Sequence, residues 1–218
     1  MPAVLTPQQD GSEVLIPDWI VDNASFLQWA ESDDAPERGK IGYFQGKVWV
    51  DQTMETDFHN FIKSEVAITV GQWVRGNDLG RYYTDGMLFS YPEIELSSEP
   101  DGIFVTKESK ATGKVWLEKG KTSMVLFGVP DLVLEVVSKS SRNKDLNLLH
   151  KLYHLAGIAE YWVINSLDKN PELVIYRHTE KAYVPVRSQS GWVKSSVLGA
   201  SFCLVIDVAN DDVRLERK

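Results

Sequence analysis

The sequence has almost no cysteine, no long apolar run and no excess of positive charge. Cys203 is the only cysteine in 218 residues, so the chain forms no internal disulfide, and no Cys or His flanks it at zinc-ligand spacing. No segment approaches the roughly 18 consecutive apolar residues of a membrane helix, and the first residues do not resemble a signal peptide. These absences predict a cytoplasmic globular protein.

The net charge of −8 comes from 31 acidic and 23 basic residues. It argues against nonspecific coating of nucleic acid, because phosphate binding draws mainly on Lys and Arg. It does not exclude a nuclease, because a site built on carboxylates is itself acidic and a bound metal ion would reverse the local sign.

The sequence predicts an N-terminal lead-in segment, residues 1–38, followed by one main domain, residues 39–218. A short amphipathic helix is predicted between Trp19 and Trp29. A β-hairpin is predicted where two apolar strands flank Gln45-Gly46, and an amphipathic helix where apolar residues recur at steps of three and four from Thr56 to Trp73.

Several shorter segments predict strands. Residues 80–91 have the composition of a strand interrupted by a turn or bulge at Asp85-Gly86. Two further short strands are predicted, at residues 103–105 and 114–117. An appended antiparallel part is predicted near the carboxyl terminus from three apolar runs, at residues 173–176, 183–186 and 202–204.

Residues 131–137 form a near-continuous apolar run that contains two acids, the pattern of a central strand buried on both faces. A helix is predicted from Leu146 to Ala156 and ends at Gly157, and a second buried strand follows at residues 161–164. A strand, a helix and a strand in succession indicate a crossover unit, and therefore an α/β core.

The acids of the central strand indicate a metal site, but Asp131 and Glu135 are not expected to bind the same ion. Asp131 and Glu135 share one face of the strand, yet their backbones lie about 13 Å apart at about 3.3 Å per residue. Asp101, at the mouth of the strand 103–105, is the better partner for Glu135. Two carboxylates from neighbouring strands, with a backbone carbonyl and waters, form the oxygen shell that Mg²⁺ prefers. The alternative is that Asp101 starts a turn and Glu135 pairs with a buried Arg or Lys.

The sequence around these acids resembles a known family. Residues 130–138 (PDLVLEVVS), followed by Tyr153 and by residues 157–164 (GIAEYWVI), are similar to the core signature of a large bacterial family of restriction-endonuclease-like proteins in the PD-(D/E)XK superfamily. Residues 99–105 (EPDGIFV) resemble its first Pro-Asp strand, and His59 matches a position often occupied by histidine. The resemblance spans about Thr53 to Asp207.

The resemblance implies an α/β (α+β) restriction-endonuclease-like fold, with a mixed central β-sheet flanked by helices. The additional antiparallel strands are expected in the N- and C-terminal parts. It also implies Asp101 and Glu135 as metal ligands, Mg²⁺ or Mn²⁺ as the cofactor and water as the nucleophile. His59 is a further candidate site residue, although a lone helical histidine is more often a packed one. Asp131 is expected to cap the entry of the strand or to orient groups around the ligands.

The lysine of the superfamily motif is missing from its usual places. In the superfamily motif this lysine comes two residues after the glutamate, and in many members of the family it instead comes four residues before the tyrosine. Counted from Glu135 and Tyr153, these two positions are Val137 and Leu149 in this chain. Lys144, at the start of the helix after the central strand, is the preferred substitute, because its ammonium could reach an attacking water or the scissile phosphate. The alternative is a solvated lysine beside Asp145.

Two other lysines are candidates for the same role. Lys151 lies about 200° around the helix from Leu149 and would need a different approach. Lys139 continues the face of Glu135 if the strand extends that far.

The function expected from these features is an Mg²⁺-dependent DNA endonuclease that works as a homodimer, because duplex cleavage needs two sites and two-fold symmetry is the commonest assembly. A catalytically inactive nuclease fold that serves as a binding or assembly module is the alternative. A β-rich sugar- or peptide-binding domain is a third reading, based on seven Trp and eight Tyr, most of them at expected core positions.

Overall fold

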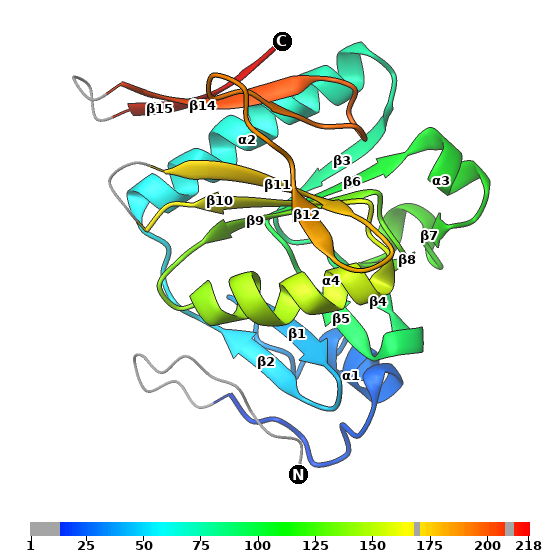
Figure 1. The fold of residues 1–218 in the computed structure, drawn as a ribbon. Helices are drawn as coiled ribbons and strands as arrows, with labels where there is room; N and C mark the ends of the chain where they lie inside the picture. The colour runs from blue at the N-terminus through cyan, green and yellow to red at the C-terminus, as the bar shows by residue number, and fades with distance from the viewer. Residues whose placement is uncertain (1–13, 168–170, 208–211) are drawn as a thin grey trace. The chain divides into compact units, whose positions relative to one another are not determined.

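The computed structural model describes residues 14–167, 171–207 and 212–218, and Figure 1 shows its path. The chain forms two compact units. The first contains Met1–Met54, Gly86–Glu99 and Trp116–Gly128, and the second contains Glu55–Asp85, Pro100–Val115 and Val129–Lys218. None of the described helices is long and apolar enough to span a membrane.

The first unit is built on a six-stranded sheet in the order β2-β1-β5-β4-β8-β7. Its elements are α1 (Asn23–Ala30), β1 (Lys40–Phe44), β2 (Val48–Asp51), β4 (Leu88–Tyr91), η1 (Pro92–Ile94), β5 (Leu96–Ser98), β7 (Val115–Trp116), η2 (Gly120–Thr122) and β8 (Val125–Gly128). The predicted helix is present as α1, and its Phe26 and Trp29 are buried in the core beside Tyr43.

The predicted hairpin is confirmed. β1 and β2 pair in antiparallel fashion with Tyr43 opposite Val48. Gln45 and Gly46 join them with φ angles of 49° and 85°, and two successive positive φ angles are what a tight type I′ hairpin turn requires.

The second unit has a mixed six-stranded sheet in the order β12-β11-β10-β9-β6-β3 and a three-stranded sheet in the order β13-β14-β15. The strands are β3 (Gly80–Thr84), β6 (Gly102–Thr106), β9 (Leu132–Val137), β10 (Glu160–Asn165), β11 (Glu172–His178), β12 (Tyr183–Pro185), β13 (Val193–Lys194), β14 (Ser201–Asp207) and β15 (Asp212–Arg217). The helices are α2 (Asp57–Gly76), α3 (Lys107–Ala111), the π-helical η3 (Lys144–Leu149) and α4 (His150–Ala156).

The predicted crossover unit is confirmed. β9 and β10 are parallel, with Glu135 opposite Val163, and η3 and α4 connect them. α4 ends at Gly157, which has a φ of 80° in the left-handed region, as the sequence predicted. With β6, β11, β12 and β3 added in antiparallel fashion, the sheet is mixed and the predicted fold class is correct.

The main core of the second unit lies around α2. Residues Ile62, Val66, Val70 and Val74 recur every four positions and pack on Leu132, Leu134 and Val136 of β9 and on Phe202, Val213 and Leu215 of β14 and β15. Figure 1 accordingly shows α2 between the two sheets of this unit. Because strand residues alternate between faces, Val133, Glu135 and Val137 point to the opposite side of β9.

Two predicted details differ from the structure. Residues 80–91 form two strands of different sheets, since β3 pairs with β6 whereas β4 pairs with β5 and β8, and Asp85-Gly86 connects them. Of the expected appended strands, β11 and β12 instead extend the central sheet, where β11 covers the edge of β10. An uncovered edge would expose unpaired backbone groups, which explains this pairing.

Candidate functional site

Polar side chains of the second unit gather at one edge of its central sheet. β9 is parallel to β10 and antiparallel to β6, which is in turn antiparallel to β3, so the carboxyl ends of β3, β9 and β10 share an edge with the amino end of β6. Asp85 follows β3, Asp101 precedes β6, and Glu135 lies toward the end of β9. Ligand sites in open α/β sheets form at this kind of edge.

Asp101 and Glu135 occupy neighbouring positions on adjacent strands. The register of β6 and β9 pairs Gly102 with Leu134, and Asp101 and Glu135 are the residues that adjoin this pair. The backbone N–H of Val136 donates a 2.6 Å hydrogen bond to Oδ2 of Asp101. Both carboxylates are buried, Glu135 at 1% exposure and Asp101 at 6%.

The backbone at Gly102, next to Asp101, lies so close to the Tyr82 side chain that only glycine fits at this position. A Cβ atom at Gly102 would lie 2.2 Å from the hydroxyl of Tyr82 on β3. Burial raises the pKa of Tyr82, and the charges of Asp101 and Asp85 raise it further, so the phenol stays protonated.

The carboxylate of Glu135 has a tyrosine and a lysine as neighbours. Tyr153 of α4 donates a 2.9 Å hydrogen bond from its hydroxyl to Oε1, and the Nζ of Lys144 lies 3.8 Å from Oε2. Lys144 Nζ is also 2.7 Å from Oδ1 of Asp145. Burial raises the pKa of Asp145, while the Lys144 ammonium opposes that increase.

Lys144 is therefore buried rather than solvated. Its exposure is 7%, and it lies beside both Asp145 and Glu135, whereas Lys139 and Lys151 are exposed. Lys144 is the first residue of the π-helical η3.

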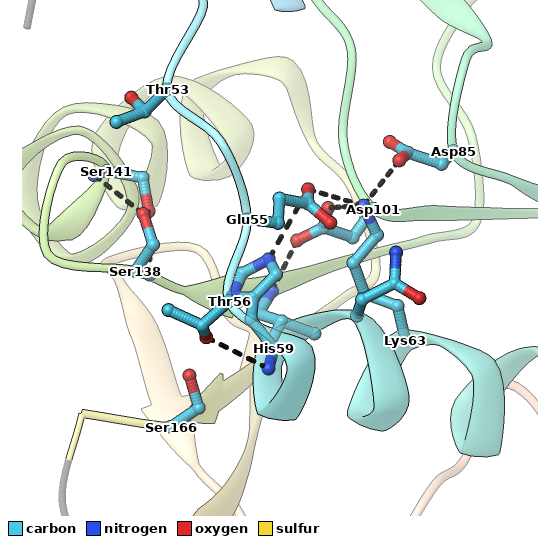
Figure 2. Close-up of polar contacts among 12 residues, drawn as sticks. Thr53, Glu55, Thr56, His59, Lys63, Asp85, Asp101, Ser138, Ser141 and Ser166 are labelled. Carbon is cyan, nitrogen blue, oxygen red and sulfur yellow. Dashed lines mark hydrogen bonds and ion pairs between the residues drawn. The ribbon is translucent and has the colours of Figure 1, made fainter. Parts of the chain in front are cut away.

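The amino end of α2 brings a second group of polar side chains to the site. Glu55, His59 and Lys63 follow one another at intervals of four residues, and Thr56 caps the helix by accepting a hydrogen bond from the His59 N–H. Figure 2 shows these side chains directed toward Asp101. His59 Nε2 lies 3.6 Å from Oε1 of Glu55.

Lys63 joins this group to the strands. Its Nζ lies 2.7 Å from Oε1 of Glu55 and 3.4 Å from Oδ1 of Asp101, and it forms a close ion pair with Asp85 (Figure 2). Glu55, Lys63 and Asp85 were not among the residues predicted from the sequence. The sequence signal for Lys63 is its four-residue spacing from His59, which places these two side chains on one face of α2, whereas Glu55 precedes the N-cap Thr56.

Glu55, His59 and Asp101 form a group that could hold a metal ion. One ligand atom from each lies within 4.8 Å of the ligand atoms of the other two. Glu135 is not a member of this group, so Asp101 is the residue that the two sides of the site share. Carboxylate oxygens and an imidazole nitrogen are ligands that divalent cations such as Mn²⁺ and Zn²⁺ take in proteins.

Asp131 lies at the other end of β9 and makes a different set of contacts. It accepts hydrogen bonds from the Thr106 N–H at 2.7 Å, the Ser109 hydroxyl at 2.7 Å and the Lys114 ammonium at 2.9 Å. Burial raises the pKa of Asp131, but these three donors lower it below its usual value. The contacts fasten β9 to the start of α3, which is a structural role.

Comparison with known proteins gives two matches. Residues 24–209 match the model of a family, Uma2, that is described as "Putative restriction endonuclease". The fold is similar to the crystal structure of "a putative nuclease belonging to DUF820 from Anabaena variabilis ATCC 29413", with a TM-score of 0.63 and 16% identity over 82% of this chain and 91% of the other. No curated protein matches the chain significantly.

Proposed function

Because the chain belongs to the Uma2 family, we propose that it is a metal-dependent endonuclease of the PD-(D/E)XK type that hydrolyses phosphodiester bonds in DNA. The observation that carries the proposal is that the Asp101 carboxylate accepts a hydrogen bond from the backbone next to Glu135, at Val136, while the Lys144 ammonium lies 3.8 Å from the Glu135 carboxylate. A pair of acids from adjacent strands with a lysine beside them has the chemistry required for metal-assisted hydrolysis.

The donor set fits a hard divalent cation. Asp101 and Glu135 supply carboxylate oxygens at one edge of the sheet, and each carboxylate is oriented by a fixed donor, the Val136 N–H or the Tyr153 hydroxyl. Oxygen ligands of this kind favour Mg²⁺ and Mn²⁺. A divalent ion held there would lower the pKa of a bound water and stabilise charge on the phosphate.

The reaction consists of in-line attack of a water oxygen on the phosphorus and cleavage of the bond to the leaving oxygen, which takes up a proton. Lys144 is the residue we assign to the missing motif lysine. Its buried ammonium orients the attacking water or contacts a phosphate oxygen, and it neutralises charge that develops in the transition state. Lys139 and Lys151 are weaker candidates because both are exposed.

Cleavage assays test the proposal directly. Purified protein is incubated with plasmid DNA and with an RNA of matched length, in Mg²⁺, in Mn²⁺ or in EDTA. We expect DNA cleavage that requires the metal and is lost in Asp101→Ala and in Glu135→Ala, whereas Glu180→Ala, which changes an exposed acid, keeps it. Preferential cleavage of RNA would overturn the proposed substrate.

Titration calorimetry with Mn²⁺ separates the enzyme from an inactive nuclease fold. Metal binding that is lost with either acid supports the catalytic site. Absence of both cleavage and metal binding in the folded wild type would favour a binding or assembly module. We also propose a cytoplasmic homodimer, and sedimentation equilibrium at the mass of a single chain would contradict that assembly.

A further inference from the structure

Lys63 is surrounded by more acids than any single ion pair requires. Its ammonium contacts Glu55, Asp85 and Asp101, which come from three separate segments of the second unit, and its side chain is only 9% exposed. A buried cation among three carboxylates occupies the kind of position that a metal ion takes in a protein.

The same position overlaps a group with metal-ligating geometry. Glu55 and Asp101 are two of the three residues whose ligand atoms, together with His59, lie within 4.8 Å of one another. Lys63 Nζ contacts one carboxylate oxygen of each of these two acids. A cation between them therefore competes with the lysine for the same oxygens.

We propose that the Lys63 ammonium takes the place of a second metal ion and so limits this protein to one divalent cation. The inference rests on the proposed function, because it takes Asp101 and Glu135 as the ligands of the one metal that binds. Two-metal nucleases hold their ions about 3.5–4 Å apart across a shared carboxylate. Asp101 is the shared residue here, with Glu135 on one side and the Lys63 ammonium on the other.

The lysine differs from a metal in ways that affect the chemistry. It carries one positive charge instead of two, it cannot activate a bound water as a Lewis acid, and it is tethered to α2. Lys63 therefore acts as a positioning residue: its ammonium occupies the oxygens of Asp101 and Glu55 and so prevents an incoming ion from binding them. Removal of its charge should open the Glu55, His59 and Asp101 group to that ion.

The test measures how many Mn²⁺ ions bind per chain, by calorimetry and by electron paramagnetic resonance, without substrate. We expect about one ion in the wild type and about two in Lys63→Met, with the spin–spin coupling of neighbouring Mn²⁺ ions in the variant only. Lys63→Arg keeps the charge and should bind one ion. Lys107→Met, which removes a surface lysine paired with Asp78, is the matched control and should also bind one.

A double variant identifies the ligands of the second ion. His59→Gln in the Lys63→Met background should return the count to about one, because the three-residue group loses its imidazole. If Lys63→Met is destabilised, the melting temperature with and without Mn²⁺ provides a second measurement of metal binding. Three carboxylates without their lysine repel one another, so Mn²⁺ should raise the melting temperature of Lys63→Met more than that of the wild type.

The outcomes distinguish this inference from the proposed function. One ion in the wild type and one in Lys63→Met would overturn the inference and leave the nuclease proposal standing. Two coupled ions in the wild type would also overturn it. No ion in the wild type and one in Lys63→Met would support the role of Lys63 while contradicting the Asp101–Glu135 metal site. An equal effect of Mn²⁺ on both melting temperatures counts against the inference.

Discussion

The two ends of the parallel pair β9–β10 hold buried acids in opposite chemical environments. At the amino end, Glu160 accepts hydrogen bonds from the Ser195 hydroxyl at 2.6 Å, from the N–H groups of Ser196 and Val197, and from the Trp162 indole. Asp131, beside it, is likewise held by an amide and a hydroxyl, with a partly exposed lysine as its third donor.

Toward the carboxyl end, Asp101 and Glu135 face buried ammonium groups, since the side chains of Lys63 and Lys144 are 9% and 7% exposed, whereas the side chain of Lys114 beside Asp131 is 38% exposed. Lys63 lies 3.4 Å from Asp101 and Lys144 lies 3.8 Å from Glu135, while the Val136 N–H donates to Asp101 and the Tyr153 hydroxyl donates to Glu135. An acid surrounded by amide and hydroxyl donors can bind a metal only by breaking those bonds. An acid that faces a buried side-chain cation can exchange it for a metal cation, so the proposed function places the chemistry at the second end.

The largest expected effect is that of Glu135→Gln on cleavage. Glutamine keeps an oxygen that can accept the Tyr153 hydrogen bond but loses the negative charge, so the rate should fall about 10³-fold, about 4 kcal/mol, with little change in folding. Initial rates of plasmid cleavage measure this loss. Glu160→Gln is the matched control at the other end of the pair, and a rate within about tenfold of wild type for Glu135→Gln would break the comparison.

Glu160→Ala should show the opposite pattern. The truncation leaves the Ser195 hydroxyl and two backbone N–H groups without their acceptor, so the free energy of unfolding should fall by about 3 kcal/mol. Urea unfolding followed by circular dichroism measures the change. Mn²⁺ affinity should stay near the wild-type value under conditions where the variant is folded, and its loss there would contradict the structural assignment.

Lys144→Met separates catalysis from metal binding. The loss of the ammonium beside Glu135 should lower cleavage about 10²-fold, about 2.7 kcal/mol, because transition-state charge is no longer neutralised. The Mn²⁺ affinity should not decrease, since a neighbouring positive charge has been removed. Lys151→Met, which changes an exposed lysine of the same helix, is the control. A larger loss in Lys151→Met than in Lys144→Met would reverse our assignment.

The smallest expected effect concerns Asp131 and acid stability. Its pKa is lower in the folded protein than the usual value of about 3.9, so its contribution is present above that value and is lost as the pH falls through the folded pKa. Asp131→Asn should lose roughly 1 kcal/mol of stability at pH 7 and show a shallower decrease on acidification. Urea midpoints at pH 7 and at about pH 3 give the slope, and parallel slopes would contradict the prediction.

Local patterns were enough to predict much of the fold. The turn at Gln45-Gly46, the apolar spacing of α2 and the strand–helix–strand order around Glu135 all depend on neighbouring residues, and each is present. The choice of Asp101 over Asp131 as the partner of Glu135 rested on strand geometry, which places Asp131 too far along the same strand, and it stays a prediction. The roles of these residues remain predictions that the experiments above test.

The surroundings of the acids could not be predicted in the same way. Lys63 meets Asp85 and Asp101 across 22 and 38 positions of sequence, and such encounters depend on how α2 packs against the sheet. The π-helical segment η3 was missed because an α-helical period of 3.6 residues was assumed for residues 146–156.

The sequence by itself determined which residues are acids on strands, which helix has an apolar face and where the chain turns, because these properties follow from periods of two and of three to four residues. Only the tertiary structure decided which cation lies beside each acid. Lys144 and Lys63 reach Glu135 and Asp101 from two different helices, and the physical reason is that long-range packing, not local spacing, sets the distance between charges.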